Sequence, residues 1–353
     1  MTPRGTDWSL AFLVALLFTT GLLSLVSGRT SDTWVIVLHG IGGFALAAVV
    51  VVKLRRVWRR LLLLERWDPR SLAGILGTLA VLLTILSGWA WSSGGDLYVA
   101  GFNLLNWHIA LGVFLTLTIA FHARLRAKPP RQHDLRSRRQ FLRLTGTAIG
   151  AAAVWMLQRP VTTAAGWRGA TQRWTGSYEQ GSFAGNAFPA TSWVADRPRP
   201  LAHDAYRLRV EGLVTAPLDL PLADLTAGDT LTATLDCTGG FYSTQDWHGI
   251  RLITVLEAAG IRAGATHVRV ISHTGYRWSF PLAEARTLLL GTAVGGDALS
   301  HEHGAPVRLV APGRRGFQWV KWVVRIELHE GPDPGAMLST IRSSLTPEGR
   351  GDV

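Results

Sequence analysis

The stretch LDCTGGFYSTQDWHGIRLITVLEAAG, Leu235–Gly260, holds the only cysteine in a chain of 353 residues. Cys237 follows an alternating run that predicts a strand, and Gly239–Gly240 come directly after it. We therefore expect the thiol at a strand end, beside a loop that a ligand can approach closely. The residues alone leave two interpretations open: a small buried hydrophobic side chain, or a nucleophile with His248 as its base. A single cysteine excludes an internal disulfide, a four-cysteine metal site and a CxxCH haem attachment.

The chain around this stretch alternates or carries β-branched clusters, which predicts strands. The predicted strands lie within Tyr206–Val214, Leu231–Cys237, His267–Tyr276, Pro306–Pro312 and Trp322–Glu330. Two runs between them, Leu220–Gly228 and Leu252–Ile261, predict short helices. The sequence therefore predicts an α+β, strand-rich domain over residues 166–353.

Five blocks in this domain resemble, in their order and spacing, the sulfite-oxidase-type molybdopterin domain. The blocks are Asn186–Pro189, Val210–Leu225, Leu235–Leu252, Gly275–Leu282 and His303–Leu328. The resemblance implies a molybdenum–molybdopterin cofactor, with Cys237 giving a thiolate to molybdenum beside the two sulfurs of the pterin. Thiolate is the kind of soft ligand that suits such a metal.

The same resemblance implies further site residues. Arg314, Arg315 and Lys321 are expected to hold the pterin phosphate, because forked or point-charge donors bind such an anion. The other residues expected at the cofactor pocket are Asn186, Phe188, Tyr242, Ser243, Asp246 and His248. Tyr242 and His248 are expected to join Cys237 in catalysis.

The first part of the chain is apolar and basic. Residues 1–157 hold 17 Lys/Arg and 6 Asp/Glu, whereas residues 158–353 hold 19 and 18, so the net charge of +12 is nearly all in the first part. Four apolar stretches of membrane-spanning length occur there: Trp8–Val26, Thr33–Val52, Ser71–Trp91 and Leu104–Phe121. We therefore predict an all-α transmembrane four-helix bundle over residues 1–126.

The basic residues of this part gather in two connections and predict its orientation. They follow the second and fourth spans, while Arg29 is the only basic residue in the connections after the first and third. Basic loops stay in the cytoplasm, so both ends of the four-helix unit are expected to face inward. This explains the charge without a nucleic-acid partner. Tryptophans near span ends are expected to be interface anchors: Trp8, Trp34, Trp89, Trp91 and Trp107.

Residues 127–165 are predicted to be a basic linker followed by a fifth apolar helix. Within them SRRQFL, Ser137–Leu142, resembles a twin-arginine export signal, and the mildly apolar run Leu144–Leu157 follows it. The alternative is a basic juxtamembrane cluster before an ordinary fifth span. We predict export of the folded outer domain by the twin-arginine machinery, with the signal retained as an uncleaved anchor that Gln158–Ala165 extends.

Histidines in the predicted spans suggest iron. His39 and His108 lie at similar depth in spans two and four, so their rings are expected to clamp a haem b axially. His122 lies fourteen residues after His108 on one helix face, but Lys53 stands fourteen residues after His39, so a second haem lacks a second histidine. The alternatives are buried histidines bonded to backbone, and a His122 that reaches the headgroups.

Together these features predict a multi-pass protein of the bacterial cytoplasmic membrane with its catalytic domain outside. We expect electrons to pass from a quinol or another membrane donor, through haem b, to molybdenum and a small substrate, an S- or N-oxide. The alternatives are a sulfite-type oxidase running in the opposite direction, a non-enzymatic membrane ligand-binding protein, and a thiol hydrolase using Cys237 and His248.

Overall fold

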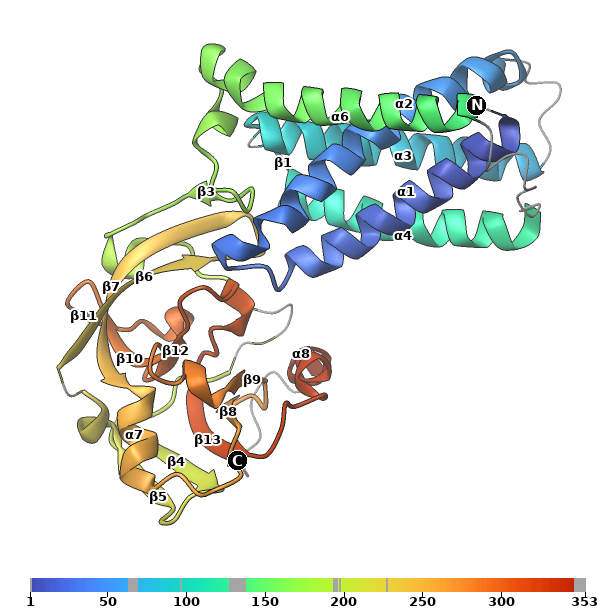
Figure 1. Cartoon of the computed structure of the whole chain (residues 1–353). Coiled ribbons are helices and arrows are strands. Elements are labelled where there is room, and N and C mark those ends of the chain that lie inside the picture. The colour runs from blue at the N-terminus through green and yellow to red at the C-terminus, as the bar shows by residue number, and fades with distance from the viewer. Residues whose placement is uncertain are drawn as a thin grey trace. The chain divides into compact units, whose positions relative to one another are not determined.

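The computed structural model describes residues 2–62, 69–95, 97–126, 138–192, 196, 198–226 and 228–345. They form two compact units, Met1–Gly176, which is helical, and Ser177–Val353, which is rich in strands (Figure 1). The helical unit runs past residue 166, where the outer domain was predicted to begin. The reason is that Gln172 Nε2 donates to Trp91 O over 3.2 Å, and Trp91 Nε1 donates to Gly176 O over 3.0 Å.

Five long helices make up the part of the helical unit that the structure describes. They are α1 Pro3–Ser24, α2 Thr33–Leu62, α3 Pro69–Ser93, α4 Leu104–Arg126 and α6 Arg138–Ala164. Short elements connect or follow them: η1 Thr30–Asp32, β1 Tyr98–Val99, β2 Phe102–Asn103 and η3 Arg168–Thr171. The first four helices are long and apolar enough to cross a membrane. Three of the predicted stretches lie within them, and the first, Trp8–Val26, extends two residues past the end of α1. In α6, 27 residues continue through Pro160, so this helix joins the run Leu144–Leu157 to the segment after it.

Apolar side chains on facing helices hold this unit together. Helix α1 contacts α2 and α4, α3 contacts α4, and α6 contacts α2. The buried core between the first four helices includes Leu10, Leu46, Val81 and Leu115. Trp91 is buried and bonded to backbone, so the prediction that it anchors the interface is wrong. Trp8, Trp34, Trp89 and Trp107 are exposed on the unit.

The first sheet of the strand-rich unit is built around β7. Its strands are β3 Tyr178–Glu179, β6 Asp229–Asp236, β7 Phe241–Arg251, β10 Leu289–Val294, β11 Asp297–Ala298 and β12 Arg308–Val310. The strands β6 and β10 flank β7 in antiparallel register, β3 runs parallel to it, and β11 and β12 both pair with β10.

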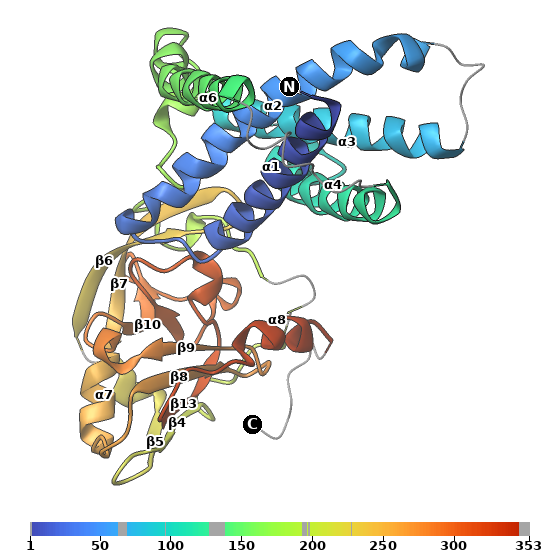
Figure 2. The same ribbon diagram turned by 45° about the vertical axis from the view of Figure 1, so that its right-hand side comes forward.

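The second sheet has the order β5-β4-β13-β8-β9. Its strands are β4 Arg207–Gly212, β5 Leu218–Pro221, β8 His267–Ser272, β9 Arg277–Pro281 and β13 Val323–His329. The strands β4 and β13 run parallel and the other neighbours antiparallel. Helix α7, Leu252–Ala259, leaves the end of β7, and α8, Ala336–Leu345, packs beside β9 (Figure 2). Single helical turns fill the connections: η4 Gly185–Ala187, η5 Leu222–Leu225, η6 Leu282–Glu284, η7 His301–His303 and η8 Gly316–Gln318.

The strand predictions are confirmed at β4, β6, β8, β12 and β13, and the second predicted helix is α7. The run Leu220–Gly228 contains only the single turn η5, because β5 occupies the residues before it. The long strand β7 was not predicted. Its core-facing positions include Ser243, Gln245 and Gly249, so its alternation does not show as an alternation of hydrophobicity.

Candidate active site

Cys237 lies in the tight turn that joins β6 to β7. Strand β6 ends at Asp236, and the turn is closed by Cys237 N donating to Phe241 O over 2.8 Å and Gly240 N donating to Cys237 O over 3.1 Å. Gly240 has φ +96°, in the region that only glycine adopts freely. The prediction of a thiol at a strand end beside a glycine loop is therefore confirmed.

The thiol of Cys237 is free and buried, with the residue 8% exposed. The backbone N–H of Gly239 donates to Sγ over 3.3 Å, and Thr191 Oγ1 lies 3.4 Å from Sγ. A donated N–H suits a sulfur that carries negative charge. Burial alone would equally fit a small hydrophobic side chain, so the neighbouring charges decide between the two interpretations.

Arg308 supplies the first of these charges. It is 1% exposed, with its guanidinium 5.0 Å from the ring centroid of Trp247 and 5.7 Å from that of Trp319. One nitrogen donates to His303 O over 3.0 Å, while Nε has no hydrogen-bond partner among the residues that the structure describes. Burial lowers the pKa of Arg308 to about 9, and the charge of Cys237 acts against that fall.

Lys321 supplies the second charge. Its Nζ donates to Glu302 O over 2.6 Å, to Thr191 O over 2.8 Å and to Ser192 Oγ over 3.3 Å. Burial, followed by Arg308, lowers the pKa of Lys321 to about 7, while the charge of Cys237 raises it. The Cys237 sulfur and the two cations therefore lie within electrostatic reach of one another.

His303 stands beside these cations as a neutral group. Its Nε2 lies 3.0 Å from Phe188 O and its Nδ1 lies 2.7 Å from Ser300 Oγ, so the ring donates to the carbonyl and accepts from the hydroxyl. Burial, and then the charge of Arg308, lowers the pKa of His303 to about 4. Phe188, expected at the pocket, is buried with its ring centroid 4.0 Å from that of His303.

These residues fit an anionic cofactor. The buried guanidinium of Arg308 and the half-buried Lys321 lie within electrostatic range of the free thiol, and one guanidinium nitrogen lacks a described partner, so an anion there would complete the site. Across the described ranges, no group of three or more His, Cys, Asp or Glu is placed to hold a metal ion.

Arg314 and Arg315, expected at the pterin phosphate, are engaged elsewhere. Arg314 forms a forked pair with Glu284, with nitrogen–oxygen distances of 3.0 and 2.5 Å. Arg315 donates to Asp236 Oδ1 over 2.6 Å and to Cys237 O over 3.2 Å, and so fixes the cysteine turn. Sequence reasoning missed Arg308, although an arginine in the apolar run Pro306–Pro312 was a signal that could have found it.

The register of the sheet separates His248 from the thiol. His248 pairs with Thr230 on β6, seven residues before Cys237, which is about 23 Å along a strand. The interpretation of His248 as a base for Cys237 is therefore wrong. The alternative function that depends on it, a thiol hydrolase, is rejected as well. Asp246 is also displaced along the strand, because it pairs with Thr232 and accepts from its hydroxyl over 2.6 Å.

The remaining predicted residues lie at varying distance from the sulfur. Tyr242 pairs with Asp236, next to the cysteine turn, and Ser243 is fully buried and accepts from Gln245 Nε2 over 2.8 Å. The amide of Asn186 bonds to the loop around Ala298 and Ser300: it donates to Ala298 O and accepts from Ser300 N, each over 2.9 Å. Asn186 therefore shapes the loop before η7, which carries His303.

The helical unit brings His39 and His108 together. Their ring centroids lie 6.1 Å apart with the planes at 81°. The Nδ1 atom of His39 lies 2.9 Å from Thr20 Oγ1, and that of His108 lies 2.9 Å from Thr84 O. Each ring is thus oriented through Nδ1, which is how metal-binding histidines are commonly held.

Glycines face these two rings, but not the glycines that follow His39. A Cβ added to Gly88 would lie 2.7 Å from His108 Cε1, and one added to Gly21 would lie 3.6 Å from His39 Cε1. A Cβ on Gly40 would instead overlap the Trp155 ring, so Gly40 makes room for helix α6. Gly42 faces Leu17, and a Cβ on Gly43 would meet nothing within 4 Å.

His122 lies in α4, fourteen residues after His108, and remains a prediction as a haem ligand. Lys53, at the matching position of α2, forms an ion pair with Asp7 over 2.9 Å. The twin-arginine motif is described from Arg138 onward, and Ser137 lies outside the described residues together with the linker from residue 127.

Comparison with known proteins places the strand-rich unit in context. A family model described as "Oxidoreductase molybdopterin binding domain" matches residues 195–337. Mitochondrial sulfite oxidase of Rattus norvegicus is 34% identical over 159 residues, or 35% of this chain. The "uncharacterized oxidoreductase YuiH" of Bacillus subtilis is 31% identical over 135 residues, or 37% of this chain. The protein-methionine-sulfoxide reductase catalytic subunit MsrP of Gluconobacter oxydans is 31% identical over 172 residues, or 42% of this chain.

The matches differ in how much of each relative they cover. The chain spans 68% of the Bacillus oxidoreductase, 54% of the Gluconobacter reductase subunit and 29% of rat sulfite oxidase. The family model lies wholly within the strand-rich unit, and its range includes Cys237, Arg308 and Lys321.

Proposed function

Since the chain belongs to the family of oxidoreductases with a molybdopterin-binding domain, we propose that it is a membrane-anchored reductase of a small S- or N-oxide. Electrons come from a membrane quinol or similar donor through haem b. The observation that carries the proposal is the free thiol of Cys237, with the buried Arg308 and the half-buried Lys321 within electrostatic range of it.

The molybdenum–molybdopterin cofactor, when bound, supplies the two-electron redox change and the oxygen-transfer chemistry. Cys237 would ligate the metal, and Gly239 N–H and Thr191 Oγ1 orient its sulfur. The buried Arg308 and the half-buried Lys321 would hold the anionic part of the pterin, because both side chains can carry positive charge. Around them, the Arg315–Asp236 pair keeps the cysteine turn in place.

Reduction is favoured over oxidation by two considerations. The reductase subunit from Gluconobacter aligns over the largest share of this chain among the three relatives. The paired histidines offer an electron entry point within the same chain. Sulfite oxidation remains the second candidate, because rat sulfite oxidase is 34% identical over 159 residues.

Haem b between α2 and α4 is supported by the histidine geometry. A metal–imidazole bond of about 2 Å, with the nitrogen about 1 Å from its ring centre, puts two axial rings about 6 Å apart. The observed 6.1 Å between His39 and His108 agrees with that spacing. The bonds at both Nδ1 atoms leave each Nε2 as the nitrogen for iron.

The membrane location is supported by the four apolar helices and the basic loops between them. We place the connection after α2 and the segment before α6 in the cytoplasm, and the strand-rich unit outside. Export through the twin-arginine route is supported by Arg138 and Arg139, whose side chains are exposed at the start of α6. The packing of α6 on α2 supports an uncleaved anchor.

Metal analysis and a visible spectrum of one preparation test the proposal. We expect one molybdenum per chain and a haem b spectrum, with reduced viologen driving methionine sulfoxide reduction. Cys237→Ala should abolish this activity and leave the haem spectrum unchanged, while Thr238→Ala keeps both. Absence of molybdenum, in a host that makes the cofactor, would favour a ligand-binding protein. Faster turnover of sulfite with ferricyanide would favour the oxidase.

A further inference from the structure

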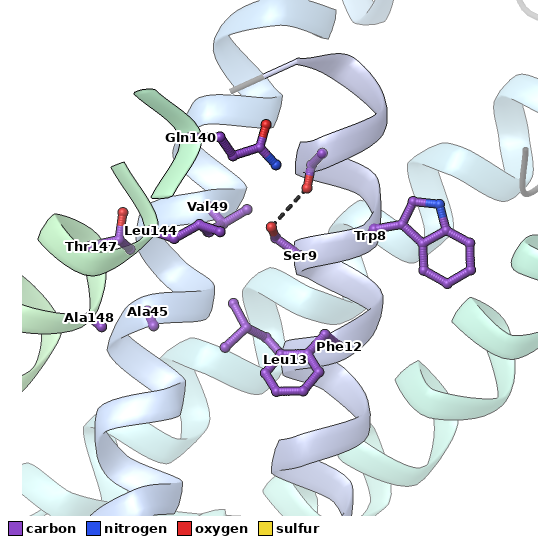
Figure 3. Close-up of a pocket in the computed structure, with 11 residues that line it drawn as sticks. Trp8, Ser9, Phe12, Leu13, Ala45, Val49, Gln140, Leu144, Thr147 and Ala148 are labelled. Carbon is purple, nitrogen blue, oxygen red and sulfur yellow. Dashed lines mark hydrogen bonds between the residues drawn. The ribbon is translucent and has the colours of Figure 1, made fainter. Parts of the chain in front are cut away.

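A pocket of about 470 Å³ opens in the helical unit, lined by α1, α2 and α6 (Figure 3). Its walls come from Gly5–Leu13 of α1, from Ala45 and Val49 of α2, and from Gln140–Ala148 of α6. From Gly5 to Leu13, and likewise from Gln140 to Ala148, the helix advances by eight residues, so the pocket is about 12 Å long. That length and volume suit a small flat molecule.

The polar groups of this pocket gather toward one end. Figure 3 shows the Gln140 amide and the Ser9 hydroxyl nearer one end, and Phe12 and Leu13 at the other. Gln140 is 6% exposed, and a Cβ on Gly5 would lie 2.4 Å from its Nε2, so only glycine leaves room for the amide. Ser9 Oγ donates to Gly5 O over 2.8 Å and retains lone pairs that can accept.

We infer that this pocket binds the ring of a membrane quinol. The inference rests on the proposed function, because that function requires an electron donor from the bilayer. The ring hydroxyls would meet the Gln140 amide and the Ser9 hydroxyl, and the tail would leave past the exposed side chain of Phe12, which is 66% exposed. A buried amide both donates and accepts, as a ring oxygen requires, whereas an acyl chain offers neither.

The position of the pocket along α2 sets the distance of the ring from the histidine pair. Ala45 lies six residues after His39, about 9 Å along the helix, and Val49, beside Ser9 in Figure 3, lies ten residues after it, about 15 Å, so the polar end that would hold the ring is the end farther from the histidines. One quinol gives up two electrons and two protons as it becomes a quinone. One sulfoxide consumes two electrons and two protons as it becomes a sulfide and water, so the two reactions balance.

Photolabelling of the full chain in nanodiscs with an azido-quinone tests the site without requiring turnover. We expect the label on Gly5–Leu13 and Gln140–Ala148, with excess decylubiquinone removing it and excess phosphatidylglycerol leaving it. Displacement by the phospholipid would overturn the inference and show an acyl-chain crevice. Label spread evenly over lipid-facing residues of all helices would overturn it as well.

Two matched substitutions on α6 sharpen the test. Ala148→Phe fills the pocket and should cut labelling and decylubiquinol oxidation at least tenfold. Ile149→Phe places the same ring on the neighbouring position, which is 65% exposed and outside the pocket, and should change neither. Equal effects of the two variants would overturn the inference.

Viologen-driven sulfoxide reduction separates this inference from the proposed function. If that activity is present and the label misses the pocket, the quinol site is wrong and the proposed function stands. If the label is in the pocket and the protein holds no molybdenum, the proposed function is wrong and the quinone site stands.

Discussion

At Arg308 the proposed cofactor binding favours a positive charge, whereas the stability of the fold favours an uncharged side chain. Its guanidinium is buried against Trp247 and Trp319, and its Nε lacks a partner in the described part of the chain. A buried charge without a full set of partners is costly, so Arg308→Met should leave the cofactor-free protein as stable or more stable. The same change should lower the molybdenum and pterin content at least tenfold, measured by metal analysis and pterin fluorescence.

Arg314→Met is the matched control for this prediction. Arg314 already pairs with Glu284, so losing it should cost stability and leave the pterin content nearly unchanged. If Arg314→Met emptied the site and Arg308→Met did not, the phosphate would lie at Arg314, as the sequence alone predicted.

His303 makes the strand-rich unit sensitive to acid. Its pKa falls to about 4 in the folded state, from about 6.5 in an unfolded chain, so between these values the unfolded chain binds the extra proton. The free energy of unfolding should therefore fall as the pH drops from 6.5 to 4, by up to about 3 kcal/mol from this group. His303→Gln, which can still donate to Phe188 O, should show a smaller fall in melting temperature over that range. An equal fall in both proteins would contradict the assignment.

At the scale of elements, the period and the length of the apolar runs predicted those helices and strands whose buried side chains are apolar. The four apolar helices and the strands β4, β6, β8, β12 and β13 follow from such patterns. Strand β7 was missed because its core face carries two buried polar residues, Ser243 and Gln245, which bond to each other through Gln245 Nε2 and Ser243 Oγ over 2.8 Å.

In the candidate site, too, local sequence patterns predicted the turn of Cys237 but not the positions that depend on strand pairing. Cys237 could be placed from its own turn, whereas the separation of His248 depends on the register of β6 with β7. The position of Arg308 near the thiol depends on the pairing of β12 with β10, which no local sequence pattern indicates.

The packing of α3 on α4 makes Gly88 a test of the proposed haem site. Gly88→Ala would place a Cβ 2.7 Å from His108 Cε1, so the ring must turn, although alanine favours the helix by up to about 1 kcal/mol. We expect haem content per chain to fall by more than half, measured by the pyridine haemochrome spectrum. Gly74→Ala on the same helix, where nothing lies within 4 Å, should keep its haem. Equal haem content in the two variants would count against His108 as a ligand.

At the scale of the whole molecule, the two parts of the chain are proposed to reach the membrane by different routes. The four apolar helices insert by hydrophobicity, with basic loops kept inside. The strand-rich unit must fold around its cofactor before it crosses, and so needs the motif at the start of α6. Arg138 and Arg139 are exposed there. Gln140, which lies between Arg139 and Phe141, is buried.

Replacing both arginines by lysine keeps the charge that orients the helices but removes the forked guanidinium groups. The Arg138→Lys, Arg139→Lys variant should therefore insert its four helices and bind haem normally, while its strand-rich unit stays inside. Protease added to spheroplasts should then leave that unit intact, whereas it digests the unit of the parent chain. The Arg124→Lys, Arg143→Lys variant has the same change of side chain outside the motif and should behave like the parent. If the motif variant were still digested from outside, the outer unit would cross by the same route as the helices, and α6 would be an ordinary fifth span.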